Sequence, residues 1–397
     1  MTRPSRGALG AHWGLDADTT FLNHGSFGAC PSAVLAEQTR LRGELEADPV
    51  EFMMRSGPVL WQQALEVLAR FLHADPGGLA FVTNATTGVN TVLRSLRFRA
   101  GDELLVSDHG YRACSNAAEF ACRRAGARVV EVPLPFQPAD EDDVVQRFLQ
   151  RVTDRTRLAL FDSVTSPTGM RLPFERLVRE LQDRGVDVLL DAAHGPGLVP
   201  LDLEALGAAY VTGNCHKWLC APKGAAFLYV RADRRQLIDP LTISHGYLAE
   251  GDATTRFRRQ FDWQGTQDPT PWLCIPAAMA EVGAMSAGGW GGVMAANHAL
   301  ALEARDILGE VLGADALPPV ACVTAMVAVR LPKSGDVAPC SPLDTDPLEQ
   351  ELYDRFRIQA MVQSWAPHGA RYLRVSAAPY NDAAEYRYLA AALSSLI

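Results

Sequence analysis

The stretch from Asp191 to Lys223 constrains this chain most, because it places charged residues among apolar and small ones. The largely apolar run 186–190 predicts a buried strand. Asp191 follows at the strand end, which is the edge where α/β sheets bind ligands. Lys217 then lies in the otherwise uncharged run Thr212–Trp218. An exposed loop lysine and a helix-capping aspartate would fit the same letters, so neighbouring segments must decide between the two interpretations.

A buried lysine has distinctive chemistry. Burial disfavours the ammonium form, lowers the pKa of the lysine and leaves a nucleophilic amine. A carboxylate at a strand tip and a nucleophilic lysine after the next strand suit pyridoxal phosphate (PLP). The carboxylate pairs with the pyridine nitrogen, and the lysine forms a Schiff base with the aldehyde. We therefore predict PLP as the cofactor, Lys217 as the catalytic lysine and Asp191 as the partner of the ring nitrogen.

The blocks around both residues resemble those of a known family. VLLDAAHGPG and GNCHKWLCAPKGAAFLYV are similar to the aspartate and lysine blocks of fold-type I PLP enzymes of the class V aminotransferase superfamily. The segments NHGSFGACP, DPVEF, HKWLCAPKG and PWL resemble its isopenicillin N epimerase-like branch. The resemblance spans about residues 20–385. It implies an α/β fold with a mostly parallel, seven-stranded sheet between helices and a smaller α+β C-terminal domain.

A candidate phosphate site follows the predicted strand 79–83. There the small hydroxyl-bearing turn 84–87 opens a predicted helix through Leu96. A helix N-terminus that carries free amides and Ser/Thr hydroxyls attracts anions. A helix cap without a ligand would look the same. The segment resembles the family's phosphate-binding block, which implies cofactor contacts from Ala85, Thr86 and Thr87.

The resemblance also assigns residues around the cofactor ring. It places an aromatic or imidazole ring after the strand 103–107, and Tyr111 fits that stacking position better than His109. It implies that Ser166 and His194 bond the 3′-oxygen of the cofactor. A neutral imidazole can donate such a bond.

Three further contacts concern the cofactor phosphate. Asn214 and His216, in the lysine block, are candidates from the same chain. Gly265-Thr266 resembles the block that reaches the phosphate of a neighbouring subunit, which implies a homodimer with shared active sites. A metal site at His194 and His216 is disfavoured because no carboxylate or cysteine follows at metal-ligand spacing.

Substrate-binding candidates come from both ends of the chain. The block around Arg374 resembles the one that carries the family's arginine for the substrate α-carboxylate, and a guanidinium matches a carboxylate with two bonds. Asn23 lies in a segment that resembles the substrate entrance, where a plain Gly-rich turn would have the same shape. Arg55 follows an apolar patch and is a candidate for substrate or for a subunit interface.

Alternating strand and helix patterns indicate a parallel sheet covered on both faces. We predict an N-terminal arm (1–20), a large PLP-binding domain (21–275) and a small C-terminal domain (276–397). Residues 240–262 are expected to be a loop, 348–360 a helix and 333–347 a polar linker.

Composition narrows the partners. The formal charge is −9 and no basic cluster offsets it, which weighs against nucleic acid and anionic membranes. Neither a signal peptide nor an apolar stretch long enough to span a bilayer is visible. The eight cysteines are scattered without a C-x-x-C pair, so we expect reduced thiols and a cytoplasmic location.

The reaction is predicted only as chemistry at Cα of an amino acid or a derivative. Epimerisation would use Lys217 to take the α-proton and Tyr111 as the second acid. A cysteine desulfurase is disfavoured because the family's persulfide cysteine precedes the carboxylate arginine, whereas residues 360–369 contain no cysteine and Cys340 lies too early. A C–S lyase or an aminotransferase remains an alternative. A non-enzymatic regulator would be expected to lack Lys217 or Asp191.

Overall fold

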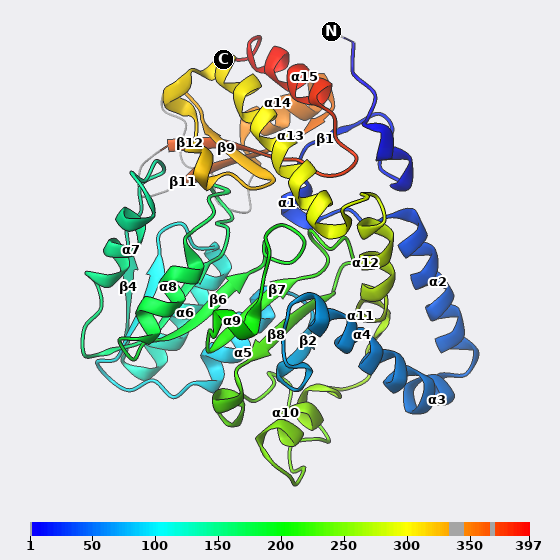
Figure 1. The fold of residues 1–397 in the computed structure, drawn as a ribbon, viewed down its shortest axis with the longest axis vertical. Helices are drawn as coiled ribbons and strands as arrows, with labels where there is room; N and C mark the ends of the chain where they lie inside the picture. The colour runs from blue at the N-terminus through cyan, green and yellow to red at the C-terminus, as the bar shows by residue number, and fades with distance from the viewer. Residues whose placement is uncertain (1, 333–344, 366–369) are drawn as a thin grey trace.

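The structure is a computed structural model that describes residues 2–332, 345–365 and 370–397, apart from the side chain of Trp365. The predicted linker 333–347 therefore falls mostly outside the described residues, as do Cys340 and part of the segment 360–369. Figure 1 shows a large sheet with helices around it, and a smaller sheet with its own helices above it.

The large sheet has seven strands in the order β2-β8-β7-β6-β5-β3-β4. Strand β8 runs antiparallel to both of its neighbours, and the remaining pairs are parallel. This confirms the predicted mostly parallel, seven-stranded sheet. The strands are β2 (Leu79–Val82), β3 (Glu103–Ser107), β4 (Arg128–Val132), β5 (Thr156–Asp162), β6 (Asp187–Ala192), β7 (Tyr210–Asn214) and β8 (Ala226–Val230).

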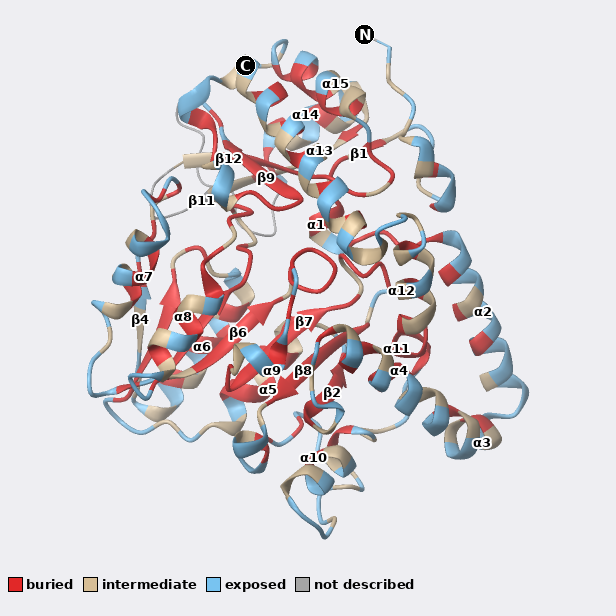
Figure 2. Ribbon diagram, in the orientation of Figure 1, coloured by how far each residue is buried: buried red, intermediate tan, exposed pale blue. Residues whose placement is uncertain are grey.

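Helices cover both faces of this sheet, which is why its central strands are buried along their length (Figure 2). Successive residues of a strand point to opposite faces. Leu189 accordingly packs in the core beneath α5 and α6, and Leu190 packs in the core on the opposite face. One face is covered by α5 (Ala85–Ser95), α6 (Arg112–Ala125) and α10 (Ala253–Phe261), and the other by α4 (Gly57–Phe71), α7 (Glu141–Leu149), α8 (Phe174–Gln182) and α12 (Ile275–Gly283).

The smaller part is built on a three-stranded antiparallel sheet in the order β11-β12-β9, with a hydrophobic core of its own. Its elements are α13 (Gly289–Leu312), β9 (Met326–Arg330), α14 (Pro347–Phe356), β11 (Met361–Trp365), β12 (Ala370–Ser376) and α15 (Ala383–Leu393). The N-terminal segment joins this part, because β1 (Thr20–Phe21) pairs with β10 (Ile358–Gln359) and Leu22 packs in the small core. The domain boundaries given above stay a prediction.

The first helices lead from the small part to the large sheet. The short α1 (His24–Phe27) lies between the two parts in Figure 1, and α2 (Ser32–Ala47) follows it. The other short segments are η1 (Ala8–His12), α3 (Pro49–Glu51), η2 (Phe52–Ser56), η3 (Pro76–Gly78), α9 (Leu203–Leu206), η4 (Ala232–Leu237), α11 (Thr270–Leu273), η5 (Ala314–Ala316) and η6 (Val320–Cys322).

Three local predictions were wrong. The expected loop 240–262 contains α10, since Asp252 caps its N-terminus and Phe257 and Phe261, one helical turn apart, are buried. The expected Gly-rich turn after Asn23 forms the single-turn helix α1. The expected helix 348–360 ends at Phe356, because Arg357 adopts a positive φ and the next two residues pair with β1. That pairing joins segments far apart in sequence, so periodicity could not reveal it.

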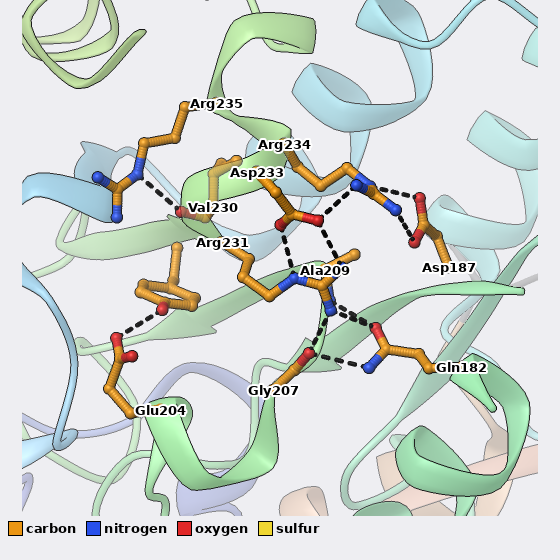
Figure 3. Close-up of polar contacts among 11 residues, drawn as sticks. Gln182, Asp187, Glu204, Gly207, Ala209, Val230, Arg231, Asp233, Arg234 and Arg235 are labelled. Carbon is orange, nitrogen blue, oxygen red and sulfur yellow. Dashed lines mark hydrogen bonds and ion pairs between the residues drawn. The ribbon is translucent and has the colours of Figure 1, made fainter. Parts of the chain in front are cut away.

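A polar network closes the lower edge of the large sheet (Figure 3). Arg234 makes two bonds to Asp187, at 2.8 and 3.0 Å, at the start of β6. Arg231 bonds the Gln182 side chain and the carbonyl oxygen of Gly207. These contacts fix η4 beneath the strands, at the edge opposite Asp191. Among the described residues, none of the helices is both long and apolar enough to cross a membrane.

Candidate active site

Several strands of the large sheet end at its upper edge, as seen in Figure 1. Strands β2, β3, β5, β6 and β7 all run in one direction, so their carboxyl ends meet there. Lys217 lies in the loop from β7 to β8, and this loop leaves and re-enters the sheet at the same edge. The fold therefore brings Asp191 and Lys217 together, as the sequence predicted for an α/β sheet.

Lys217 is partly buried among charged and polar groups. Its Nζ lies 3.0 Å from Nε2 of His194. Burial, followed by the positive charge of Arg374, lowers the pKa of Lys217 to about 8, while Asp191 and Asp162 act in the opposite direction. Roughly a tenth of the amine is then neutral at pH 7, and the neutral amine is the form that attacks an aldehyde.

Asp191 is the penultimate residue of β6 and pairs in register with a second carboxyl, Asp162, which ends β5. The Asp191 carboxylate accepts hydrogen bonds from the Cys114 thiol (3.2 Å) and the Ala193 amide (2.9 Å). Asp162 accepts bonds from the backbone amides of Ser166 and Tyr111. Burial and the neighbouring Asp191 raise the pKa of Asp162 well above its usual value, and burial also raises the pKa of Asp191. The pair therefore tends to share one proton.

His194 links the lysine to an indole. Its Nδ1 accepts a hydrogen bond from Nε1 of Trp218 at 3.2 Å, and its Nε2 faces Lys217. Burial, followed by the positive charge of Lys217, lowers the pKa of His194 well below its usual value. The imidazole is therefore neutral near pH 7, as expected for a donor to the 3′-oxygen of PLP.

The N-terminus of α5 lies at the same edge of the sheet. The side-chain oxygen of Asn214 accepts a bond from the Ala85 amide at 2.8 Å, and Asn84 caps the Thr87 amide. Gly88 permits this approach, because a Cβ there would lie 2.1 Å from Oγ1 of Thr212 on β7. The amide of Thr86 stays among those without an intrahelical partner. Asn214 thus positions the helix end expected to bind the phosphate.

Arg374, on β12, is a residue of the small part of the chain that lies at this site. It is 1% exposed, and its guanidinium donates to the carbonyl oxygen of Ser166 and to Oγ of Ser26 (3.0 Å). Ser26 in turn donates to the side-chain oxygen of Asn23 at 2.7 Å. The Nε of Arg374 is buried without a hydrogen-bond partner among the described residues. A buried guanidinium with an unused donor suits an anionic ligand group such as a carboxylate.

Tyr111 is the N-cap residue of α6 and remains 46% exposed. Burial, then the charges of Cys114 and Asp191, raise the pKa of its phenol, and Arg374 acts in the opposite direction. Tyr111 therefore lies among the site groups with its hydroxyl protonated. His109 is buried instead. Its Nδ1 lies 2.6 Å from Oγ1 of Thr168 and its Nε2 lies 3.1 Å from the carbonyl oxygen of Leu134, which fits a structural role.

Three predicted residues take other positions. Arg55 is exposed on η2, and Thr266 is exposed in the loop before α11. His216 turns its Nδ1 towards the carbonyl oxygen of Ala225 at 2.9 Å, and burial lowers its pKa to about 4. A neutral ring that donates from Nδ1 leaves only a lone pair on Nε2 for a phosphate. Its phosphate contact stays a prediction.

The segment after β1 packs directly on the lysine loop. His24 lies with Nε2 3.0 Å from the carbonyl oxygen of Lys217 and Nδ1 2.8 Å from the hydroxyl of Tyr380. Gly28 has φ +70°, and a Cβ there would lie 2.2 Å from the His216 carbonyl oxygen. Only glycine fits such an approach in that conformation.

Sequence reasoning assigned no role to Asp162, Cys114, Ser26, His24 or Trp218. Asp162 could have been predicted from the sequence, because it follows a largely apolar run just as Asp191 does. The others gave none, since their partners are distant in sequence: Cys114 lies 77 residues from Asp191, and Ser26 lies 348 from Arg374.

The donor set fits PLP. A partly buried amine lies near a strand-tip carboxylate, a neutral imidazole lies beside the amine, and a helix N-terminus offers free amides. The orphaned Nε of Arg374 adds a place for a substrate anion. In the described part of the chain, no group of His, Cys, Asp and Glu side chains is arranged to hold a metal ion.

Comparison with known proteins identifies the family. The aminotransferase class-V family model matches residues 56–318. The chain is 35% identical to isopenicillin N epimerase from Streptomyces clavuligerus, over 96% of both chains. It is 30% identical to a probable chloroplastic L-cysteine desulfhydrase from Arabidopsis thaliana, over 96% of this chain and 84% of that protein. The chain therefore belongs to the class V aminotransferase family, whose enzymes depend on PLP.

Solved structures share the fold. The cystine C–S lyase C-DES, in complex with cysteine persulfide, superposes with a TM-score of 0.79 at 22% identity, covering 95% of this chain and 98% of that one. Another C-DES structure contains glycine covalently linked to the PLP cofactor. At this identity the likeness shows the fold, and it confirms the predicted architecture.

The carboxyl pair generates a stability prediction. Because the native pKa of Asp162 is raised, the wild-type chain loses stability as pH rises from the unfolded pKa towards the native one, by about 1.4 kcal/mol per pH unit. Asp162→Asn removes this loss, so its stability relative to wild type should increase as pH rises above about 4, the usual pKa of an aspartate. Urea unfolding of the cofactor-free chain across pH measures the difference.

Ser163→Ala is the matched control for this experiment. It changes the neighbouring buried residue without removing an ionisable group, so its difference from wild type should stay constant with pH. A constant difference for Asp162→Asn as well would show that Asp162 ionises normally in the native chain.

Proposed function

We propose that this protein is a PLP-dependent epimerase that removes and returns the α-proton of an amino acid or an amino-acid-derived substrate. The observation that carries the proposal is the 35% identity to an isopenicillin N epimerase across nearly the whole of both chains. The partly buried Lys217, beside His194, Asp191 and Arg374, supports the chemistry.

In this proposal each residue has a stated task. Arg374 holds the substrate carboxylate through its unused Nε and its guanidinium edge. Lys217 binds the cofactor aldehyde and, when released from it, takes the α-proton. When bound, PLP supplies an electron-poor ring that withdraws electrons from Cα. Asp191 carries the negative charge that keeps the ring nitrogen protonated, and Cys114 and Ala193 stabilise that charge by hydrogen bonds.

The remaining contacts hold the cofactor in place. The phosphate is assigned to the N-terminus of α5, with Ala85, Thr86 and Thr87, to Asn214 at the end of β7, and to His216, whose Nε2 would accept from a protonated phosphate oxygen. Ser166 and His194 are assigned to the 3′-oxygen, and Tyr111 to the ring face. Asn23 acts on the substrate through Ser26, which bonds both Asn23 and Arg374. Arg55, which is exposed, stays a candidate for contact with the substrate or with a partner subunit.

A C–S lyase is the second candidate. It is favoured by the desulfhydrase relative, at 30% identity, and it needs the same first step at Cα. An aminotransferase would share that step too but return the proton to the cofactor. The cytoplasmic location stays a prediction, for which the free thiols of the seven described cysteines are the support.

Proton NMR of the holoenzyme in deuterated water tests the function directly. L-amino acids and cysteine conjugates are supplied without a keto acid. Loss of the α-proton signal with appearance of the D form is the expected result. Pyruvate, ammonia and a released thiol would instead indicate elimination. Lys217→Ala should abolish every reaction, whereas Lys223→Met, at the other lysine of the same loop, should keep it.

A second acid is needed to return the proton from the opposite face. We assign it to Tyr111, which lies near Asp191 with a protonated hydroxyl. Tyr111→Phe should keep α-proton exchange and slow inversion by about 100-fold or more, the usual contribution of an acid. Tyr388→Phe, whose hydroxyl bonds a carbonyl in the small part, is the control. Unchanged inversion in Tyr111→Phe would remove Tyr111 from this role.

We further propose a homodimer in which Thr266 reaches the phosphate site of the second copy. Thr266 is exposed in this chain, which supports the proposal. A residue that binds the cofactor phosphate but is exposed in its own chain would reach the phosphate of a second copy. Chains carrying Lys217→Ala and Thr266→Asp are each expected to be inactive. Their mixture should regain about a quarter of the wild-type rate, because half of randomly mixed dimers contain one intact site. A mixture that stays inactive would contradict shared sites.

A further inference from the structure

Trp218, the residue after the lysine, takes part in a directed chain of hydrogen bonds. Its indole nitrogen lies 3.2 Å from Nδ1 of His194, and Nε2 of the same ring lies 3.0 Å from Nζ of Lys217. Trp218 and His194 are only 3% and 2% exposed, so water does not compete for these positions. The ring of His24 lies against the indole, with ring centroids 4.9 Å apart.

The direction of this chain follows from the chemistry of the indole. An indole N–H donates a hydrogen bond and has no lone pair to accept one. Nδ1 of His194 must therefore be the acceptor and carries no proton. A neutral imidazole has one N–H, so the proton of His194 lies on Nε2. Nε2 then donates to Lys217, and only a neutral amine can accept that bond.

We propose that Trp218 is a positioning residue that holds His194 in the Nε2–H tautomer and thereby keeps Lys217 as a neutral, nucleophilic amine. Without the indole N–H, His194 is free to place its proton on Nδ1. Its Nε2 would then accept a bond from a lysine ammonium, which is the unreactive form. The identity of residue 218 thus selects the protonation state of its neighbour in sequence through a residue 24 positions away.

Other charges act on Lys217 from each element packed around it. Arg374 on β12 favours the neutral amine, whereas Asp191 on β6, Asp162 on β5 and Cys114 on α6 favour the ammonium. These four groups remain when Trp218 is changed to phenylalanine. The substitution therefore isolates the hydrogen-bond chain from the surrounding electrostatic field.

The inference deepens the proposed function and rests on Lys217 being the catalytic lysine. In this proposal the single N–H of His194 has two acceptors in turn. In the cofactor-free protein Nε2–H bonds the amine. When Lys217 is engaged by the cofactor, the same N–H would be left to donate to the 3′-oxygen. Trp218 would then fix the donor for both states.

Nitrogen-15 NMR of the histidine rings tests the tautomer in the full-length, cofactor-free chain and in the holoenzyme. The chain has nine histidines, and His194→Gln identifies the signal of His194. Wild type should show the Nε2–H form, and Trp218→Phe should shift His194 towards the Nδ1–H form. Trp272→Phe is the matched control, because its indole donates to the carbonyl oxygen of Val82 at 2.9 Å and it should leave His194 unchanged.

Carbon-13 labelling of lysine tests the consequence. Lys217, Lys223 and Lys333 are the only lysines in the chain, so the titration of Lys217 is resolvable. Its midpoint should rise by about one pH unit in Trp218→Phe, since one net hydrogen bond corresponds to about that shift. Trp272→Phe should have the wild-type midpoint.

Each outcome decides the proposal. A proton on Nδ1 of His194 in the wild-type chain overturns it, whether or not Trp218→Phe folds. An unchanged tautomer and an unchanged lysine midpoint in a folded Trp218→Phe overturn it as well. Cofactor binding is read separately from the visible absorbance of added PLP. Failure to bind PLP would therefore count against the proposed function, and the tautomer result would still stand alone.

Discussion

The partial burial of one lysine amine is the constraint on which the rest of the site depends. An amine partly withdrawn from solvent at the edge of a sheet keeps its charge only where neighbouring groups stabilise the ammonium form. Burial and Arg374 disfavour the ammonium of Lys217, whereas two carboxyls favour it. The resulting pKa of about 8 lies near neutral pH, where both the amine and its conjugate acid are populated.

The two parts of the chain share this site. The large sheet supplies Asp162, Asp191 and the lysine loop, and the small sheet supplies Arg374. The segment 23–28 connects them, because Ser26 bonds Arg374 and His24 bonds the lysine backbone. Anything that moves the small sheet therefore also moves the groups around the amine.

Much of the fold was readable in advance because its signals are local. Apolar runs of strand length, each followed by small or polar residues, gave the parallel sheet and the edge that carries Asp191. The helix α10 was missed because a polar, arginine-rich segment buries only Phe257 and Phe261. The end of α14 was missed because Arg357 turns the chain into a pairing with residues near the N-terminus. Pairings between segments so far apart produce no periodic pattern of apolar residues in the sequence.

The sequence by itself determined the chemical identities: a lysine and an aspartate in blocks that resemble one family, and therefore the cofactor. Only the tertiary structure decided the protonation states, because these depend on distances between residues from separate elements. Asp162 became a partner of Asp191 when their strands paired in register. Trp218 bonds His194 because the loop folds back over the sheet edge, and a donor without a lone pair then fixes where the imidazole proton lies.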